Sequence, residues 1–278
     1  MSGAGRRPLA AALPGGLALR ALWQYRGFVF ALVRREFEAR YLQSVLGSAW
    51  AVLTPLAMIV IYTVIFAGVM RTRLPGEDDR LAYSIYLCAG LLPWGWFLEV
   101  VTRTLTVFPD NAALLKKASF PRSVLPATLA CSATLNFSII FGLFLLVLAA
   151  TGRWPGWAVL GLAPLFALQL LFALGLGLLL GVLNVFFRDV GQFVGVLLQF
   201  WFWLTPIVYS AAILPERARA WLNLNPLTAL VDAYQRLLLT GAWPDWTAFG
   251  WHLAGTLVLC GLAAFAFDRL QGEMVDEL

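Results

Sequence analysis

The sequence predicts an all-α, polytopic membrane protein with about six transmembrane helices, an N-terminal interfacial helix and re-entrant helices before the last span. Hydrophobic residues make up 61% of the 278 residues and charged residues only 13%, and long apolar runs recur along the chain. About 20 apolar residues rising ~1.5 Å each match a hydrocarbon core of ~30 Å. A chain of this length then forms one transmembrane domain, 25–267, with little left for a separate soluble domain.

Residues 1–24 are predicted to be a flexible N-terminal segment. Arg6-Arg7 precedes an apolar run, in outline like a secretory signal, but Pro14-Gly15-Gly16 interrupts that run. A cleaved signal is therefore disfavoured.

Residues 25–41 are predicted to form an interfacial helix, because apolar residues such as Phe28, Leu32 and Phe37 fall on one side of it. The pattern is imperfect, since Glu36 and Arg40 project toward the apolar side. We expect this helix to lie flat at the membrane surface before the first span.

Six apolar stretches are then long enough to be interpreted as membrane spans. Gly177 and Gly181, within the fourth, have the small-xxx-small spacing that allows close helix packing, within or between subunits. The six stretches are 50–70, 82–101, 124–150, 157–183, 193–210 and 247–267.

Segment 205–246 departs from this pattern, because four prolines interrupt a segment whose middle is largely apolar. Proline lacks an amide donor, so no straight span runs through it. We expect external re-entrant helices here, and the alternative is an ordinary external loop with one amphipathic surface helix.

The distribution of basic residues predicts the orientation of the chain. With six spans, thirteen of the twenty Lys and Arg residues fall on the side that carries both termini and loop 103–123. Basic residues accumulate on the cytoplasmic side of membrane proteins. Both termini, including the tail 268–278, are therefore predicted to be cytoplasmic.

Several functional classes lack their sequence signatures. No phosphate-binding G-x-x-x-x-G-K-[ST] loop exists, because the chain has only two lysines, Lys116 and Lys117, and neither follows a glycine. Three cysteines without metal-ligand spacing and a single histidine argue against a metal site. The formal charge of +5 is spread over loops between apolar spans, which favours lipid headgroups over nucleic acid as partners.

Two passages resemble a known family. Residues 40–50 with Thr54-Pro55-Leu56, and residues 111–122 with Leu125-Pro126, are similar to motifs of the permease subunits of ABC-type polysaccharide and polyol-phosphate exporters, which carry O-antigen or teichoic acid. Shorter matches occur in the same order, so that the resemblance covers about residues 25–245. They are Leu91-Leu92-Pro93-Trp94, 184–190, 205–209 and Asn225-Pro226-Leu227.

The resemblance implies a permease of the bacterial cytoplasmic (inner) membrane. It implies a homodimer that binds two separate ATP-binding subunits on its cytoplasmic side and moves a lipid-linked glycan outward. ATP and Mg would belong to the partner subunits, and this chain would have no catalytic residue and no cofactor or metal of its own.

Loop 103–123 is the candidate contact with the ATPase. In the functional interpretation its basic residues and its Phe-Pro turn dock in a groove of the ATPase, and in the alternative they only anchor the loop to lipid phosphates. The candidate residues are Lys116, Lys117, Phe120, Pro121 and Arg122.

The corner between the interfacial helix and the first span is a candidate entry site for the lipid pyrophosphate. Arg40 offers several donors that suit a diphosphate, and Gly47 permits a tight bend. Tyr41 and Ser44 complete this candidate site. The alternative is that Arg40 only extends to ordinary phospholipid headgroups.

Aromatic residues provide a candidate glycan path, because sugar rings stack on aromatic faces. The alternative is that these residues are ordinary interfacial anchors. The candidates are Trp94, Trp96, Phe97, Trp201, Trp203 and Tyr209.

Two pairs of opposite charges are predicted to be structural. Arg188 and Asp189 adjoin at a span end, and Glu99 lies four residues before Arg103, the helical spacing that lets the two neutralise each other. A proton-coupling role for Glu99 is the alternative and would indicate a proton-driven carrier. A membrane-embedded glycolipid-modifying enzyme is the other alternative function, and the chain shows no local signature for one.

Overall fold

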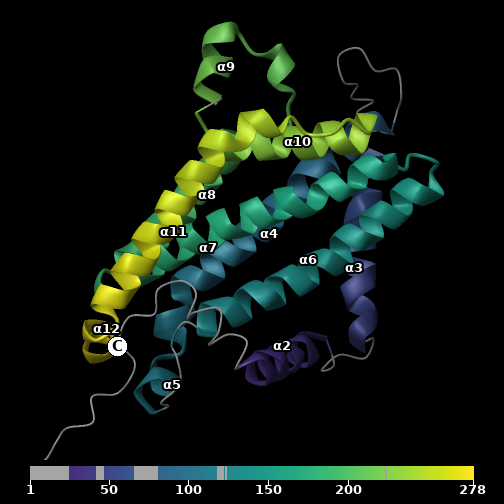
Figure 1. Cartoon of the computed structure of the whole chain (residues 1–278). Helices are drawn as coiled ribbons and strands as arrows, with labels where there is room; N and C mark the ends of the chain where they lie inside the picture. The colour runs from purple at the N-terminus through teal and green to yellow at the C-terminus, as the bar shows by residue number, and fades with distance from the viewer. Residues whose placement is uncertain (1–24, 42–46, 66–80, 118–121, 123, 223) are drawn as a thin grey trace, which may run out of the picture.

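The computed structural model describes residues 25–41, 47–65, 81–117, 122, 124–222 and 224–278. Every regular element within these ranges is helical, as predicted. The expected N-terminal segment 1–24 lies outside the described residues. Figure 1 shows long helices running alongside one another between two ends of the molecule, with short helices at each end.

Among the described residues, four helices have the length and apolar composition to cross a bilayer, and they coincide with four of the predicted spans. They are α4 (Ala82–Asp110), α6 (Val124–Ala150), α7 (Leu162–Phe186), which follows the 3-10 turn η3 (Gly156–Gly161), and α11 (Gly250–Leu270), which follows the 3-10 turn η5 (Trp246–Phe249). The predicted first span, 50–70, begins with α3 (Trp50–Tyr62), and its last five residues lie outside the described ranges.

Helix α4 is the central helix of the bundle. In its most apolar stretch 67% of the residues are buried, against 17% in α11. It contacts α6, α7 and the later helix α10 (Pro226–Thr240). The buried amide of Gln169 in α7 donates to the carbonyl of Pro93 in α4 at 2.7 Å, so a polar group in the core is satisfied across this contact.

The small-residue spacing in α7 forms a contact within one subunit. A Cβ added at Gly181 would lie 2.7 Å from the carbonyl oxygen of Thr104, and one added at Gly177 would lie 2.8 Å from the Cβ of the same threonine. Both glycines therefore allow the backbones of α7 and α4 to approach closely. In the structure, this spacing therefore makes a contact within a subunit.

The predicted fifth span is shorter in the structure than in the sequence interpretation. Residues 193–210 were expected to span, whereas α8 (Asp189–Trp203) has 15 residues, a rise of about 22 Å against ~30 Å for a hydrocarbon core. Beyond α8 the chain turns at Pro206, which has no amide to continue the helix. The hydroxyls of Tyr83 and Tyr86 in α4 donate to the carbonyls of Val208 and Tyr209, at 2.7 and 2.9 Å.

The proline-containing segment 205–246 includes the short helix α9 (Glu216–Leu222) and the longer helix α10. Helix α10 is capped at both ends, by the Asn225 side chain and by Gly241 with a φ of 68°. One face of α10 is buried against α4 and η3, including the fully enclosed Tyr234. It is therefore an integral part of the bundle at this end, and its insertion into the outer leaflet stays a prediction.

The opposite end of the molecule carries three short or peripheral helices: α2 (Arg26–Tyr41), α5 (Ala112–Lys117) and α12 (Glu273–Glu277). In Figure 1 they lie together at the lower end, and α9 and α10 lie at the upper end. Helix α2 contacts α6.

Candidate functional site

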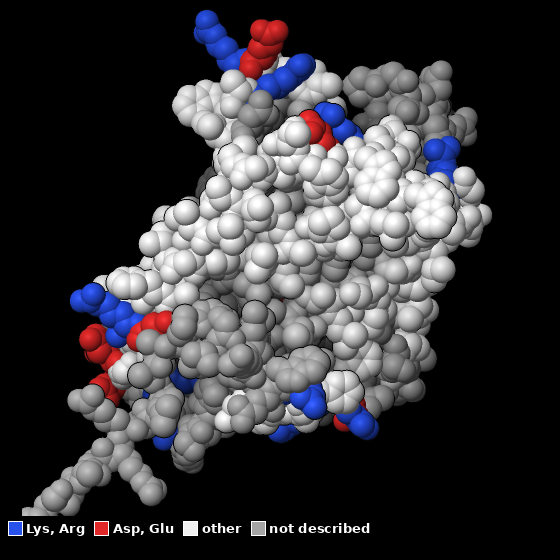
Figure 2. All heavy atoms as spheres, viewed as in Figure 1, with Lys and Arg blue, Asp and Glu red and all other residues white. Residues whose placement is uncertain are grey.

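Charged side chains gather at the two ends of the molecule, with a wide uncharged band between them in the view of Figure 2. The lower end is the richer in basic residues within the described part of the chain, in agreement with the predicted orientation. It carries Arg26, Arg34, Arg35, Lys116, Arg122, Arg188 and Arg269, and the upper end carries Arg153, Arg217, Arg219 and Arg236.

The candidate coupling segment is described in part. Lys116 is exposed at the end of α5, whereas Leu115 beside it is buried. The Arg122 guanidinium donates through Nη1 to the carbonyl oxygen of Gln271, just beyond α11. Phe120 and Pro121 lie outside the described residues. The side chain of Lys117 lies outside them too.

The candidate lipid-pyrophosphate corner is likewise described only at its edges. Gly47 begins a 3-10 turn, η1 (Gly47–Ala49), with a φ of 51°, a backbone conformation that glycine adopts readily. Ser44 lies outside the described residues, and so do the side chains of Arg40 and Tyr41, which end α2. The entry site stays a prediction.

A charge network joins α2 to the bundle. Arg103 Nη1 lies 3.3 Å from Glu99 Oε1, so the predicted helical pair is formed. The same guanidinium donates through Nη2 to Glu36 Oε1 of α2. Asn136 of α6 approaches the other Glu99 oxygen at 3.5 Å. Glu36, the residue that made the α2 pattern imperfect, therefore faces a cation of α4.

Other charged side chains of α2 are more exposed to solvent than Glu36. Arg34 pairs with Glu38 one turn later at 2.7 Å, and the hydrogen bond that it donates to this carboxylate raises the pKa of the Arg34 guanidinium. Arg35 lies at a groove of about 260 Å³ between α2, α4 and α6. The other lining residues are mostly apolar, among them Leu32, Val107, Leu125 and Leu129.

Arg188 and Asp189 are both exposed at the junction of α7 and α8. No ion pair joins these two side chains in the structure of the described residues. Arg188 instead lines a second groove, of about 190 Å³, together with Asn184 of α7, Pro109 of α4 and Glu277 of α12. The structural pairing expected from their adjacency is not seen.

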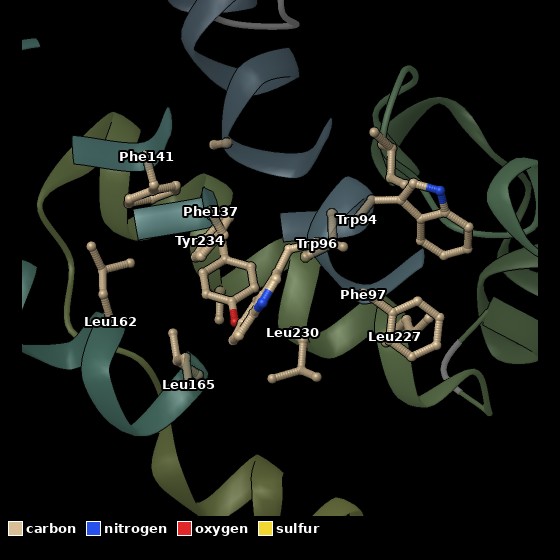
Figure 3. Close-up of a cluster of buried hydrophobic side chains, with 14 of the residues drawn as sticks. Trp94, Trp96, Phe97, Phe137, Phe141, Leu162, Leu165, Leu227, Leu230 and Tyr234 are labelled. Atoms are coloured by element: carbon tan, nitrogen blue, oxygen red, sulfur yellow. The ribbon is translucent and has the colours of Figure 1, made fainter. Parts of the chain in front are cut away.

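Three of the candidate glycan-path residues belong to the packed core, as Figure 3 shows. Trp94, Trp96 and Phe97 are 6%, 4% and 0% exposed. Trp96 stacks on Phe137 of α6 with ring centres 4.5 Å apart and an angle of 6° between the rings. No face of these rings is free for a sugar in this arrangement. Packing against other aromatic side chains is enough to explain why these three residues cluster, and a sugar ligand is not needed to explain it.

The other three candidates lie around the end of α8. Trp201 is half-buried and donates through Nε1 to Asn225 Oδ1 at 2.8 Å, which gives it a structural role. Trp203 is 64% exposed. Tyr209 is half-buried, and its hydroxyl donates to the carbonyl of Trp203 at 2.8 Å. Of the six aromatic candidates, Trp203 is the one whose ring is open to a ligand.

Two residues with connecting roles were not among the sequence candidates. Asn225 holds the end of α8 to the start of α10, and Glu36 holds α2 to α4. The Asn-Pro pair at Asn225 is a recognisable helix-start signal in the sequence. In the sequence, Glu36 was distinguished only by its place on the apolar side of the predicted amphipathic helix.

A comparison with known proteins matches residues 28–239 to the family model described as ABC-2 type transporter. The chain is 34% identical over 262 residues to the O-antigen export system permease protein RfbA of Myxococcus xanthus, covering 94% of this chain and 98% of that protein. It is 33% identical over 220 residues to the protein of the same name from Klebsiella pneumoniae, covering 77% and 83%. It is 23% identical over 240 residues to the polysialic acid transport protein KpsM of Escherichia coli, covering 85% and 92%.

Proposed function

Because the chain belongs to the ABC-2 type transporter family, we propose that it is the membrane-spanning permease subunit of an ATP-driven exporter of a lipid-linked polysaccharide of the O-antigen class. The observation that carries this proposal is the similarity to an O-antigen export permease along nearly the whole of both chains. The bundle of apolar helices with a basic end supports it. The subunit would work as a homodimer with two ATP-binding subunits, which bind the ATP and Mg.

The proposed location is the bacterial cytoplasmic membrane, with both termini on the cytoplasmic side. The lower end in Figure 1 would then face the cytoplasm, because the basic helices α2 and α5 lie there with α12. The ATP-binding subunits would dock at this end, against the segment 112–122 that contains Lys116 and Arg122. The glycan would leave at the end that carries α9 and α10.

The ring of Trp203 is the strongest remaining candidate for contact with the glycan, since this side chain is 64% exposed near the end of α8. Trp94, Trp96 and Phe97 would reach a sugar only after the core around them had opened. In the export assay below, Trp203→Ala is expected to reduce glycan export. The matched control is Trp157→Ala, because Trp157 is 81% exposed on the turn η3, away from α8.

The test is reconstitution in vesicles with and without the ATP-binding subunits of an ABC-type polysaccharide exporter. We expect ATP-dependent movement of lipid-linked glycan only when both kinds of subunit are present. The charge-reversal variant Lys117→Glu combined with Phe120→Ala should abolish export, whereas Arg217→Glu at the opposite end should not. ATP hydrolysis or glycan movement by this chain alone would refute the proposal.

A further inference from the structure

The cytoplasmic end of the bundle has an apolar cluster of its own, separate from the main core. Its members come from six helices, and two of them belong to the short helices α5 and α12. The buried members are Val107, Phe108, Leu115, Leu125, Val182, Val185, Phe267 and Met274. This cluster brings residues that are far apart in the sequence to one place.

Helix α12 holds several elements together at this point. Met274 is 2% exposed, although its helix has only five residues. Helix α12 contacts both α5 and α7. On the adjoining helix α11, Phe267 stacks on Phe108 of α4, with ring centres 5.6 Å apart. The last helix is therefore packed into the bundle through an apolar anchor.

Segment 112–122 also makes a polar contact with the bundle, at Arg122. Arg122, which follows α5 and precedes α6, donates to the carbonyl of Gln271, which links α11 to α12. Helix α5 has six residues, and isolated helices shorter than about 12 residues are marginal in water. Its position therefore depends on the packing of Leu115 and on the elements around it.

We propose that residues 271–277 form a C-terminal clamp that positions α5 and transmits its displacement to α11 and α7. Met274 and Arg122 are positioning residues in this arrangement: Met274 belongs to the same apolar cluster as Leu115, and Arg122 donates to the carbonyl oxygen of Gln271. The transmission part rests on the proposed function, in which α5 lies in the segment that receives the ATPase. The positioning part concerns this chain alone.

The first experiment measures amide hydrogen exchange of residues 112–117 in the purified full-length permease, without any ATPase. Met274→Ala empties an apolar site, and Arg122→Gln removes the contact with Gln271 while leaving the cluster intact. Each is expected to speed exchange in α5 at least fivefold. The matched control is Glu273→Ala, an exposed residue of the same helix, which should leave exchange unchanged. Unchanged exchange in both test variants would overturn the clamp.

The second experiment measures glycan exported per ATP hydrolysed in the complex with the ATP-binding subunits. We expect Met274→Ala to retain ATPase binding, with this ratio lowered at least threefold, and Glu273→Ala to match the wild type. Arg122→Gln is left out of this experiment, because Arg122 lies in the segment that is proposed to contact the ATPase. A normal ratio in a Met274→Ala variant whose α5 exchanges faster would overturn the transmission part. Failure of the wild-type complex to export would instead refute the proposed function, and the exchange result on the permease alone would still decide the positioning part.

Discussion

Asn225 shows how a single residue sets the geometry of one end of the bundle. Its Oδ1 accepts from Leu227 N at 3.0 Å as the cap of α10 and from Trp201 Nε1 at 2.8 Å. Its amide donates to Thr205 Oγ1 at 2.9 Å and to the carbonyl of Leu204 at 3.2 Å. One side chain therefore joins the end of α8 to the start of α10.

Replacing Asn225 with Ala is expected to destabilise the protein by about 2–4 kcal/mol, since a lost cap costs ~1 kcal/mol and each of the three further hydrogen bonds about 0.5–1 kcal/mol. Asn225→Asp keeps the accepting oxygen and loses the donating amide, so a loss of about half that size is expected. Thermal unfolding of the purified protein in detergent measures both. An alanine variant as stable as the wild type would show that these contacts contribute nothing.

At the scale of the helix, the contact between α4 and α7 requires glycine. An added Cβ at Gly181 meets the backbone carbonyl of Thr104 at 2.7 Å, a contact that a side-chain rotation cannot relieve. Gly181→Ala should therefore push the two helices apart and destabilise the bundle by about 1–3 kcal/mol. The control is Gly142→Ala in α6, where no atom lies within 4 Å of the added Cβ. Alanine there should be neutral or slightly stabilising, because it favours the helix.

Thermal unfolding compared between these two alanine variants isolates the effect of the contact, because both positions are inside membrane helices. Equal unfolding temperatures would show that the α4–α7 interface tolerates an added methyl group. A lower export activity of Gly181→Ala at a temperature where it stays folded would link this spacing to function as well.

The helices also show which elements could be predicted from the sequence. The spans of α4, α6, α7 and α11 follow from the length of local apolar runs, and such runs need no knowledge of the fold. The end of α8 depends on Pro206, on the two tyrosines of α4 and on Asn225, which is 20 residues beyond Thr205. When an apolar run continues past a turn that distant residues hold in place, the sequence alone predicts a longer membrane span than the structure contains.

At the scale of the whole molecule, the sequence predicted the basic end of the protein but not the contacts made there. Charge bias between loops is a local property, and the Glu99–Arg103 pair follows from helical spacing. The partner of Arg103 in α2 is 67 residues away, and that of Arg122 is 149 residues away. Trp94 and Trp96 are buried, which their sequence pattern did not indicate, because clustering in the sequence does not distinguish a packed core from an open surface.

The network around Arg103 provides a test between ATP-driven export and a proton-driven carrier. The side chains of Arg103, Glu99 and Glu36 are 22%, 23% and 29% exposed, so they are largely removed from water. In this arrangement the Glu99 carboxylate balances the charge of Arg103 and approaches Asn136 of α6. Glu99→Gln is therefore expected to keep export within about twofold of wild type at every pH tested, because the amide still accepts a hydrogen bond and Glu36 still balances the cation.

Arg103→Gln is expected to be the more damaging change. It leaves two partly buried carboxylates without their shared cation, at an expected cost of about 1–3 kcal/mol, less than for a fully buried pair. Adding Glu36→Gln to that variant should recover part of the lost stability, since it removes one of the two like charges and relieves their repulsion. A carrier that takes protons through Glu99 would behave in the opposite way: Glu99→Gln would stop transport altogether, while Arg103→Gln would shift its pH dependence.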